Sequence, residues 1–372
     1  MKARVVLLVT GLTPGGAEKQ VVHLARELGG RGWEVSIVSL MGKLKHAPPG
    51  GACFSLPIYT LGMRAGVPDP RALARLIGLL NRLRPQILHS HLFHANLAAR
   101  VARLWCPVPV EISSIHSMAE SGRDSERIWL RDLIYRVTGP LADCTTAVSR
   151  AAGERHASAG AVRRSRLRIV PNGVDTAAFR PDPQRRARVR ERLGLGSAFV
   201  WLAAGRLMWK KDYPTLLRAC AALGSPVVLI AGEGPQEGEL RRMARDLGVD
   251  ARFLGRVDGM AELMKAADGL VLSSVVEGLP VVLVEAAAGG LPAVATDCGG
   301  VREIVRDGET GFVVPPRDPA ALAAAMSRLA ALPEAEREAM SRAAREHAAG
   351  FDLAAIAAQW ESLYRELLER AL

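Results

Sequence analysis

The segment SSVVEGLPVVLVEAAAGGLPAVATDCGGVREIVRDGETG, residues 273–311, carries two carboxylates eight positions apart, Glu277 and Glu285. Gly278 and Pro280 follow the first carboxylate, and small apolar residues lead to the second. Because proline is tolerated at the first position of a helix, we expect a helix to begin near Pro280. Glu277 then lies in the preceding loop and Glu285 in the second helical turn. This short hook of chain can aim both carboxylates into one cleft.

The same hook presents the N-terminus of the predicted helix. The first N–H groups of a helix have no partner inside it, and the helix dipole favours an anion at that end. A neutral, polyhydroxylated group carried on a phosphate suits a site that combines these N–H groups with two carboxylates.

Length and charge indicate two folded domains with different electrostatics. The chain has 372 residues, more than one ordinary core accommodates, and 49% of them are hydrophobic. Residues 1–180 carry 25 Lys and Arg against 12 Asp and Glu, whereas residues 181–372 carry 24 against 26. This one-sided charge indicates an anionic partner, such as nucleic acid, an acidic membrane surface or a phosphorylated substrate, or else only solvated arginine faces.

The cysteines indicate a reducing compartment. Five cysteines are scattered along the chain with no CxxC pair and no histidine at ligand spacing, so neither a zinc site nor a disulfide framework is predicted. A cytoplasmic protein is expected. These cysteines are Cys53, Cys106, Cys144, Cys220 and Cys298.

The first part of the chain alternates strands and helices. Residues 4–9 predict a buried parallel strand, and the turn GLTPGGAE (11–18), a helix to about Leu28 and a second strand follow. Gly15 and Gly16 allow the backbone to approach a ligand closely. The turn does not match GxGxxG, and no acidic residue is placed for a ribose after the second strand, which argues against a dinucleotide site.

The same alternation restarts near residue 198 and predicts a second parallel α/β sheet. The turn PNGVD (171–175) and the Pro- and Arg-rich residues 180–192 predict a linker. We therefore expect one domain over residues 1–180 and another over 181–351, followed by an amphipathic helix over 352–372.

Histidines lie near two predicted strand ends. His89, His91 and His94 fall in HSHLFHAN at the end of a short strand. A metal site is one interpretation, but no local carboxylate or cysteine completes a ligand set, so a loop at the carboxyl edge of the sheet is favoured. His116 follows the next strand, where open α/β sheets place site residues; a loop histidine with a local hydrogen bond is the alternative.

Residues 127–137, RIWLRDLIYRV, predict a basic amphipathic helix. Helices of this kind can lie on anionic membranes, which makes a peripheral membrane contact one interpretation. More often such a stripe is a core-facing surface with solvated charges, and the periodicity favours this second interpretation.

Motifs along nearly the whole chain resemble a known enzyme family. They are GGAE (15–18), PNGVD (171–175), GRL…KD (205–212), FLGRV (253–257), EGLPVVLVE (277–285) and GGVREIVRDGETGFVVPP (299–316). This set is similar to the retaining GT-B glycosyltransferases of glycosyltransferase family 4. The motif has GLP where many relatives have GFG, a common variant that leaves its role intact. An extra Trp209 between Arg206 and Lys211 bears on how far Lys211 reaches.

The resemblance implies an α/β protein of the GT-B fold, with two Rossmann-like domains facing across an interdomain cleft. The N-terminal domain would take the acceptor and the C-terminal domain the nucleotide sugar, and the C-terminal helix would pack back on the first domain. The implied reaction is retaining transfer of a hexosyl or N-acetylhexosaminyl group, from a UDP-sugar in preference, to a saccharide or lipid-linked acceptor in cell-surface polysaccharide or glycolipid assembly. It implies no cofactor, no metal and no nucleic acid, in the cytoplasm or at the inner membrane face.

The resemblance also implies roles for individual residues. Arg206 and Lys211 would bind the donor diphosphate, Glu277 would contact the sugar near the reacting carbon, and His116 would reach that sugar from the first domain; these four are the implied catalytic residues. Glu285 would bind the ribose. The other implied donor-binding positions are Gly15, Gly16, Gly205, Gly255, Arg256, Val257, Gly278, Leu279, Pro280 and Val281. With no DxD motif near a strand end, cations and helix N-termini would stabilise the leaving diphosphate.

Alternative functions remain open at this point. A nucleotide-sugar epimerase on the same two-domain plan would interconvert donors without an acceptor. A non-catalytic module that binds a nucleotide or an anionic glycan would tolerate replacement of Glu277. Glu277 as a covalent nucleophile is a further alternative for the mechanism. Nucleic-acid binding is less favoured, because the basic residues are not interleaved with aromatics or placed on a recognisable motif.

Overall fold

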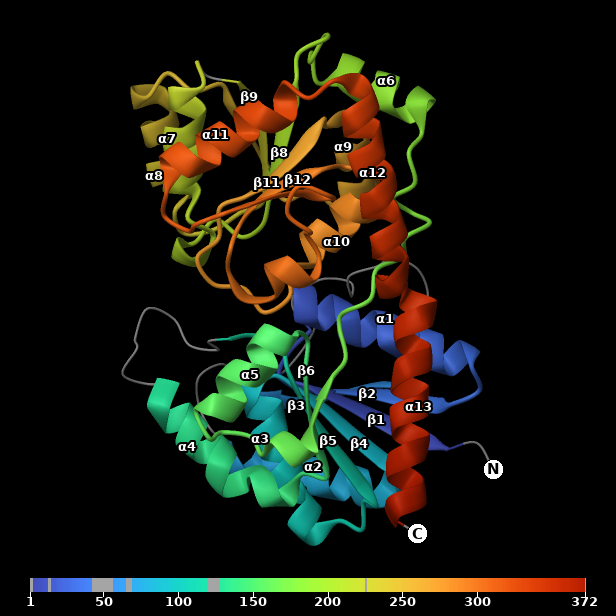
Figure 1. The fold of residues 1–372 in the computed structure, drawn as a ribbon. Coiled ribbons are helices and arrows are strands. Elements are labelled where there is room, and N and C mark those ends of the chain that lie inside the picture. Colours follow the sequence, from blue (N-terminus) through green and yellow to red (C-terminus); the bar gives the residue numbers. More distant parts are fainter. Residues whose placement is uncertain are drawn as a thin grey trace. The chain divides into compact units, whose positions relative to one another are not determined.

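The structure is a computed structural model that describes residues 3–12, 15–41, 56–64, 69–118, 128–224 and 226–371. Cys53, Arg127 and Leu372, which enter the predictions above, lie outside these residues. The chain divides into two compact units (Figure 1). Unit 1 comprises Met1–Gly173 and Leu353–Leu372, and unit 2 comprises Val174–Asp352.

Unit 1 is built on a seven-stranded parallel sheet in the order β3-β2-β1-β4-β5-β6-β7. Leu7 belongs to the core beneath α1 and α13, and the next residue, Leu8, to the core beneath α2 and α3. Burial on both faces explains why β1 is an uninterrupted apolar run. The elements are β1 (Arg4–Val9), α1 (Gly16–Gly30), β2 (Glu34–Met41), β3 (Ile58–Met63), α2 (Pro70–Leu83), β4 (Ile87–His91), α3 (Phe93–Ala102), η1 (Arg103–Trp105), β5 (Val110–Ile115), α4 (Ile128–Thr138), η3 (Gly139–Leu141), β6 (Cys144–Ala147), α5 (Arg150–Ser158), η4 (Arg164–Arg166), β7 (Leu167–Ile169) and α13 (Leu353–Ala371).

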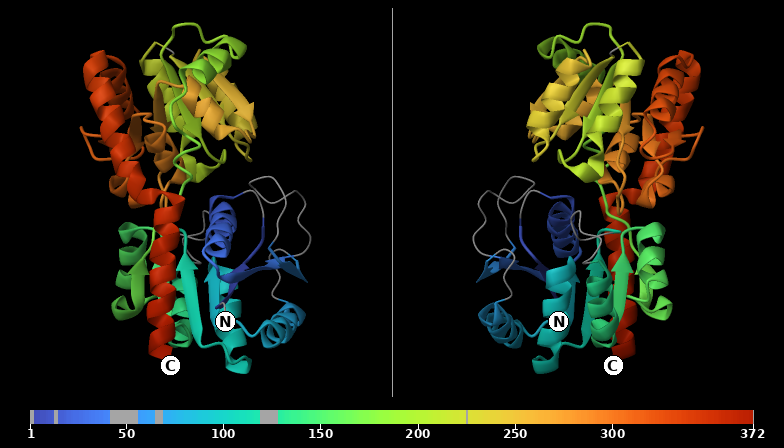
Figure 2. Two further views of the ribbon diagram at one scale, coloured as in Figure 1. Left: turned by 90° about the vertical axis from the view of Figure 1, so that its right-hand side faces the viewer. Right: turned by 90° about the vertical axis from the view of Figure 1, so that its left-hand side faces the viewer.

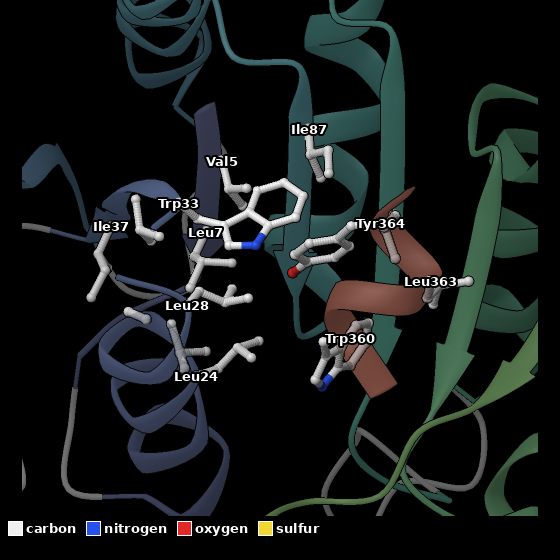
Figure 3. Packing of buried hydrophobic residues seen from close by; sticks show 14 of the residues in the cluster. Val5, Leu7, Leu24, Leu28, Trp33, Ile37, Ile87, Trp360, Leu363 and Tyr364 are labelled. Atoms are coloured by element: carbon white, nitrogen blue, oxygen red, sulfur yellow. The ribbon is translucent and has the colours of Figure 1, made fainter. Parts of the chain in front are cut away.

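The C-terminal helix α13 is part of unit 1, and it lies along the sheet beside α1 (Figures 1 and 2). Tyr364 packs edge-on against Trp33, with ring centroids 5.5 Å apart (Figure 3). The indole N–H of Trp33 also donates a hydrogen bond to Glu361 at 3.2 Å. Edge-to-face aromatic pairs stabilise a core beyond their area burial, so these contacts anchor the end of the chain on unit 1.

Unit 2 contains a six-stranded parallel sheet in the order β10-β9-β8-β11-β12-β13. Its largest core lies between the sheet and helices α7, α8 and α11. The elements are α6 (Pro183–Arg192), β8 (Val200–Ala204), η5 (Trp209–Lys211), α7 (Tyr213–Ala222), β9 (Val227–Ala231), α8 (Glu237–Asp246), β10 (Ala251–Gly255), α9 (Met260–Ala266), β11 (Gly269–Leu272), α10 (Val281–Ala288), β12 (Ala293–Thr296), η6 (Gly299–Glu303), β13 (Gly311–Val314), α11 (Pro319–Ala330), α12 (Glu334–Ala348) and η7 (Ala349–Phe351).

The prediction of two parallel α/β sheets is confirmed, but part of the predicted linker is wrong. The units divide between Gly173 and Val174, whereas much of the expected linker beyond residue 180 forms helix α6. Asp182 caps this helix through the backbone N–H of Arg185, and Pro183 occupies its first turn. Arginines of α6 bind Asp268 and carbonyl groups at the end of α9. The arginine-rich composition suggested a solvent-exposed linker, but these side chains hold α6 on unit 2.

Candidate functional site

The predicted hook is present in unit 2. Pro280 is the N-cap of α10, Glu277 lies in the loop before it, and Glu285 lies in the second turn, as the sequence predicted. The Oε1 atom of Glu277 is 2.6 Å from the Nζ atom of Lys211 and accepts a hydrogen bond from the hydroxyl of Ser274 at 2.7 Å. The side chains of Glu277 and Lys211 are only 13% and 19% exposed. Shielding from water strengthens the attraction between these two charges.

Two backbone contacts hold Lys211 beside the hook. The carbonyl oxygen of Lys211 accepts a hydrogen bond from the hydroxyl of Ser273 at 2.8 Å. The carbonyl of Lys210 accepts from the N–H of Val275, also at 2.8 Å. The loop after β8 is thus bonded to the loop after β11, and the extra Trp209 does not prevent Lys211 from reaching Glu277.

The two arginines of the predicted donor-binding set differ in their partners. Arg206 is exposed, and within the described part of the chain its guanidinium has no hydrogen-bond or carboxylate partner. Arg256, in the loop before Val257, bonds to Asp258 at 3.2 Å, and its backbone N–H donates to Glu233 at 3.3 Å. Arg206 therefore keeps a planar set of donors that can grip a phosphate, whereas Arg256 is partly engaged.

Glycines pack the loops after β8, β9 and β10 closely together. Gly205, Gly232 and Gly255 have φ values of +151°, +147° and +64°, which L side chains rarely adopt. The N–H of Gly232 donates to the carbonyl of Gly255 at 2.7 Å, and a Cβ atom at Gly232 would overlap the carbonyl of Gly205. The polypeptide here takes a path that glycine alone fits without strain.

Replacing Gly232 with alanine is expected to destabilise unit 2 by about 2 to 3 kcal/mol, because the new Cβ must displace backbone in a strained conformation. The matched control is Gly238→Ala in α8, where a Cβ meets nothing within 4 Å. That control is expected to be neutral or to stabilise the helix by about 0.5 kcal/mol. Urea unfolding of both variants measures the difference, and equal stabilities would show that the glycine packing is not needed.

In unit 1 the predicted glycine turn leads into α1. Gly15 is the N-cap, Gly16 is the first helical residue, and the N–H of Lys19 donates to the carbonyl of Gly15 at 3.1 Å. A Cβ atom at Gly16 would meet nothing within 4 Å, so the start of the helix is open on that side. The start of a helix in general suits an anionic group.

Three histidines from two neighbouring strands lie together in unit 1. The Nδ1 atom of His91 is 3.1 Å from the Nε2 atom of His116. The rings of His89 and His91 are tilted by 40° to each other, with centroids 4.0 Å apart. His89 is bonded to the hydroxyl of Tyr364 at 2.6 Å and to Ser114 at 2.7 Å. The sequence placed His116 correctly after β5 but missed its partner His91. The pairing of His91 with His116 could have been predicted from the parallel alignment of β4 and β5, which brings the carboxyl ends of the two strands together.

Burial keeps these histidines neutral. Loss of solvation lowers the pKa of His116 to about 4 and the pKa values of His89 and His91 well below 6.5. At neutral pH, His116 is therefore an uncharged imidazole that can donate or accept one hydrogen bond. The Nδ1 atom of His116 and the Nε2 atom of His91 are buried and have no partner among the described residues.

The metal interpretation of the first three histidines finds no ligand set. His94 lies on α3, where its ring is edge-on to Phe93, while His89 and His91 are inside β4, so the predicted loop at this point is wrong. Among the described residues there is no group of three His, Cys, Asp or Glu side chains that could hold a metal ion.

A pocket in unit 1 opens beside the paired histidines. His91, Ser114 and His116, at the carboxyl ends of β4 and β5, are among its polar lining residues. The remaining lining residues are Gln20, Leu24, Glu27, Thr146, Val148, Val170, Pro171, Asn172, Gly173, Leu353, Ile356, Ala357 and Trp360. His91 and His116 therefore line a pocket, and each has one ring nitrogen without a partner among the described residues.

Family models match both halves of the chain. One described as Glycosyltransferase Family 4 matches residues 14–178, and one described as Glycosyl transferases group 1 matches residues 198–331. The putative glycosyltransferase EpsD of Bacillus subtilis is 32% identical over 321 residues, which cover 82% of this chain and 81% of EpsD.

A mycobacterial relative is more similar over a shorter region. The GDP-mannose-dependent alpha-(1-6)-phosphatidylinositol monomannoside mannosyltransferase of Mycolicibacterium smegmatis is 40% identical over 213 residues. The match covers 53% of this chain and 56% of that protein, so the chain spans little more than half the length of this relative.

Solved structures share the fold over the whole chain. Sucrose-phosphate synthase from Thermosynechococcus elongatus matches with a TM-score of 0.87 at 23% identity and covers 99% of this chain and 100% of its own. HepE from Anabaena, solved with UDP, matches with a TM-score of 0.82 at 22% identity and covers 98% and 100%. At these identities the likeness establishes the GT-B fold alone.

Proposed function

The chain belongs to glycosyltransferase family 4, and we propose that it transfers a sugar, with retention of configuration, from a nucleotide sugar to a saccharide or lipid-linked acceptor. The product is a cell-surface polysaccharide or glycolipid, made in the cytoplasm or at the inner face of the membrane. The donor we propose first is a UDP-sugar, and a GDP-sugar is the competing donor, since the mycobacterial relative is named for GDP-mannose.

The observation that carries the proposal is the pair of Lys211 and Glu277 at the start of α10, with Arg206 nearby in sequence. An ammonium group has three donors, and Glu277 takes one of them, so Lys211 can bind a diphosphate while it still holds the carboxylate. Arg206 adds a bidentate contact. As the glycosidic bond breaks, negative charge grows on the leaving diphosphate, and these two cations stabilise it.

In the proposed mechanism Glu277 positions the sugar. Ser274 and Lys211 both donate to one oxygen of Glu277, which leaves its other oxygen to accept a hydroxyl of the sugar. Front-face attack by the acceptor, guided by the leaving phosphate, accounts for retention without a covalent intermediate. His116 contacts the transferred sugar through a neutral imidazole.

The remaining donor contacts that we propose come from loops and helix starts. Glu285 binds the ribose hydroxyls, the backbone of residues 278–281 binds the sugar and phosphate, and the Gly255–Val257 loop lines the base. Gly205 lets the chain pass close to the diphosphate, and Gly15 and Gly16 shape the acceptor side. No metal takes part in this proposal, so turnover is expected to persist in the presence of a chelator.

A donor screen tests the proposal. We expect UDP-sugars to raise the apparent thermal stability of the purified protein, because a ligand that binds only the folded state stabilises it, and we expect release of UDP when an acceptor is supplied. GDP- and ADP-sugars are the matched comparison. Failure of all three classes to bind, in a protein that remains folded, would contradict the proposal. Interconversion of donor sugars without an acceptor would favour an epimerase instead.

A further inference from the structure

Exposed apolar side chains gather in one region of unit 1. In the described part of the chain, six of the seven large hydrophobic side chains that are exposed belong to α4 or η1, and the seventh is Leu247 in unit 2. We call these six residues the α4–η1 surface. They are Leu104, Trp105, Trp129, Leu130, Leu133 and Val137.

Helix α4 has two apolar faces, and only one of them packs on the protein. Tyr135 is 2% exposed and joins Phe93 and Ile115 in a small core, as an ordinary surface helix would. Trp129 and Val137 lie two turns apart with Leu133 between them, and they are 63% and 68% exposed. The interpretation favoured from the sequence, that the whole apolar stripe of this helix faces the core, is therefore wrong.

Segment η1, which carries Leu104 and Trp105, lies near the C-terminal end of α4. The guanidinium of Arg103, in η1, donates to the carbonyl of Leu141, just beyond the end of α4, at 3.1 Å. Arg100, one turn earlier, donates to the hydroxyl of Thr138 at 3.0 Å. Helix α4 packs on α3, on the opposite side of the sheet from α1 and α13, and Figure 1 shows it at the outer edge of unit 1.

Positive charge flanks this surface without being neutralised. Arg136 donates to the carbonyl groups of Ala159 and Gly160, both at 3.0 Å, and Arg166 donates to that of Ala142 at 2.6 Å. In the described part of the chain neither arginine has a carboxylate partner that would offset its positive charge. The one acid of α4, Asp132, is paired with Arg155 at 2.6 Å. Apolar and aromatic groups are thus bordered by net positive charge.

We propose that the α4–η1 surface docks the protein onto an anionic lipid bilayer. Tryptophan, with an apolar ring and one N–H donor, suits the boundary between headgroups and acyl chains, and the arginines meet the negative headgroups. A second copy of the chain is a poor occupant, since a symmetric contact would place the same positive border against itself. This inference rests on the proposed function, which allows a reaction at the inner face of the membrane, and it names the surface that would make that contact.

Vesicle flotation of the full chain tests the docking. We expect binding to vesicles that contain phosphatidylglycerol, much weaker binding to phosphatidylcholine alone, and weakening by high salt. Changing Trp105 and Trp129 together to serine is expected to reduce partitioning by about tenfold or more, because binding scales with buried apolar area. Trp129→Phe should retain most of the binding. The matched control is Leu247→Ser in unit 2, which should bind as the wild type does.

Each outcome decides the proposal. Circular dichroism and the thermal midpoint of the double serine variant establish that it is folded. Equal partitioning of that variant and the wild type would overturn the proposal, as would equal binding to both kinds of vesicle. Self-association in solution that disappears in the double variant would assign the surface to a second copy. Because no sugar is present, failure here would leave the proposed transferase activity unaffected.

Discussion

Replacing Lys211 with alanine is expected to lower kcat/KM for sugar transfer by about a hundred- to a thousandfold, since one preorganised charge at a developing anion is worth that much. Lys210→Ala is the matched control, because Lys210 lies in the same short turn, with its ammonium near the ring of Trp209. A surface substitution of this kind changes stability by about 0.5 kcal/mol or less, so kcat/KM is expected to stay close to the wild-type value. Steady-state kinetics with the donor found in the screen measure both variants.

Loss of Lys211 also leaves Glu277 without its cation, so a purely structural effect must be separated from a catalytic one. Breaking a shielded ion pair destabilises a protein because one charge stays buried without a partner. The double variant Lys211→Ala, Glu277→Gln removes that charge and is expected to recover stability in urea without recovering activity. Recovery of activity together with stability, or equal losses in the Lys210 and Lys211 variants, would contradict a role for Lys211 on the diphosphate.

The hook could be predicted from the sequence because its determinants are local. The spacing of Glu277, Pro280 and Glu285 sets which residue lies in the loop and which in the second turn of α10, and the structure agrees. The bond from Lys211 to Glu277 could not be derived in this way. That bond depends on the order of strands in the sheet, because the pairing of β8 with β11 brings the two loops together. It also depends on Ser274, which donates to Glu277 but belongs to no recognisable sequence motif.

Two other predictions were wrong in part, one about a linker and one about the direction of an apolar face. The arginine-rich α6 has only one buried side chain, Val189, so it lacks the apolar stripe that marks a surface helix. For α4 the predicted helix and its apolar stripe are present, but the prediction that the stripe faces the core is wrong at Trp129 and Val137, which are exposed. Periodicity reports which residues share a face, whereas what covers that face is decided by the tertiary fold.

The stability of unit 1 is expected to fall steeply below pH 6.5. Burial lowers the folded-state pKa of His89, His91 and His116, so from about pH 6.5 downwards the unfolded chain binds protons at these positions that the folded protein does not. Stability that is fully present above pH 6.5 is therefore lost as the pH falls, down to about 4 for His116. Each such proton contributes about 1.4 kcal/mol per pH unit.

Glu111 acts in the opposite direction. It is fully buried, and burial raises its pKa from 4.5 to about 7, although Arg100 and the hydroxyls of Ser90 and Ser113 partly offset this effect. Between pH 4.5 and 7 the folded protein therefore holds a proton that the unfolded chain has released. His89, His91 and His116 against Glu111 leave about two protons taken up on unfolding, a loss of about 2.7 kcal/mol per pH unit between pH 6 and 5. Burial also lowers the pKa values of His94 and His156, which adds to this loss in the same direction.

Two substitutions change this slope in opposite senses. His91→Asn removes one proton from the balance and should reduce the slope by about 1.4 kcal/mol per pH unit, whereas Glu111→Gln should steepen it by the same amount. Hydrogen exchange of the β4 and β5 amides, corrected for intrinsic rates, reports the unfolding free energy of unit 1. His347→Asn on α12 is the control and should leave that slope unchanged. If the dependence of unfolding free energy on pH were the same in the wild type and all three variants, the paired histidines would be protonated as readily in the folded state as in the unfolded one. The neutral imidazole proposed for His116 would then be wrong.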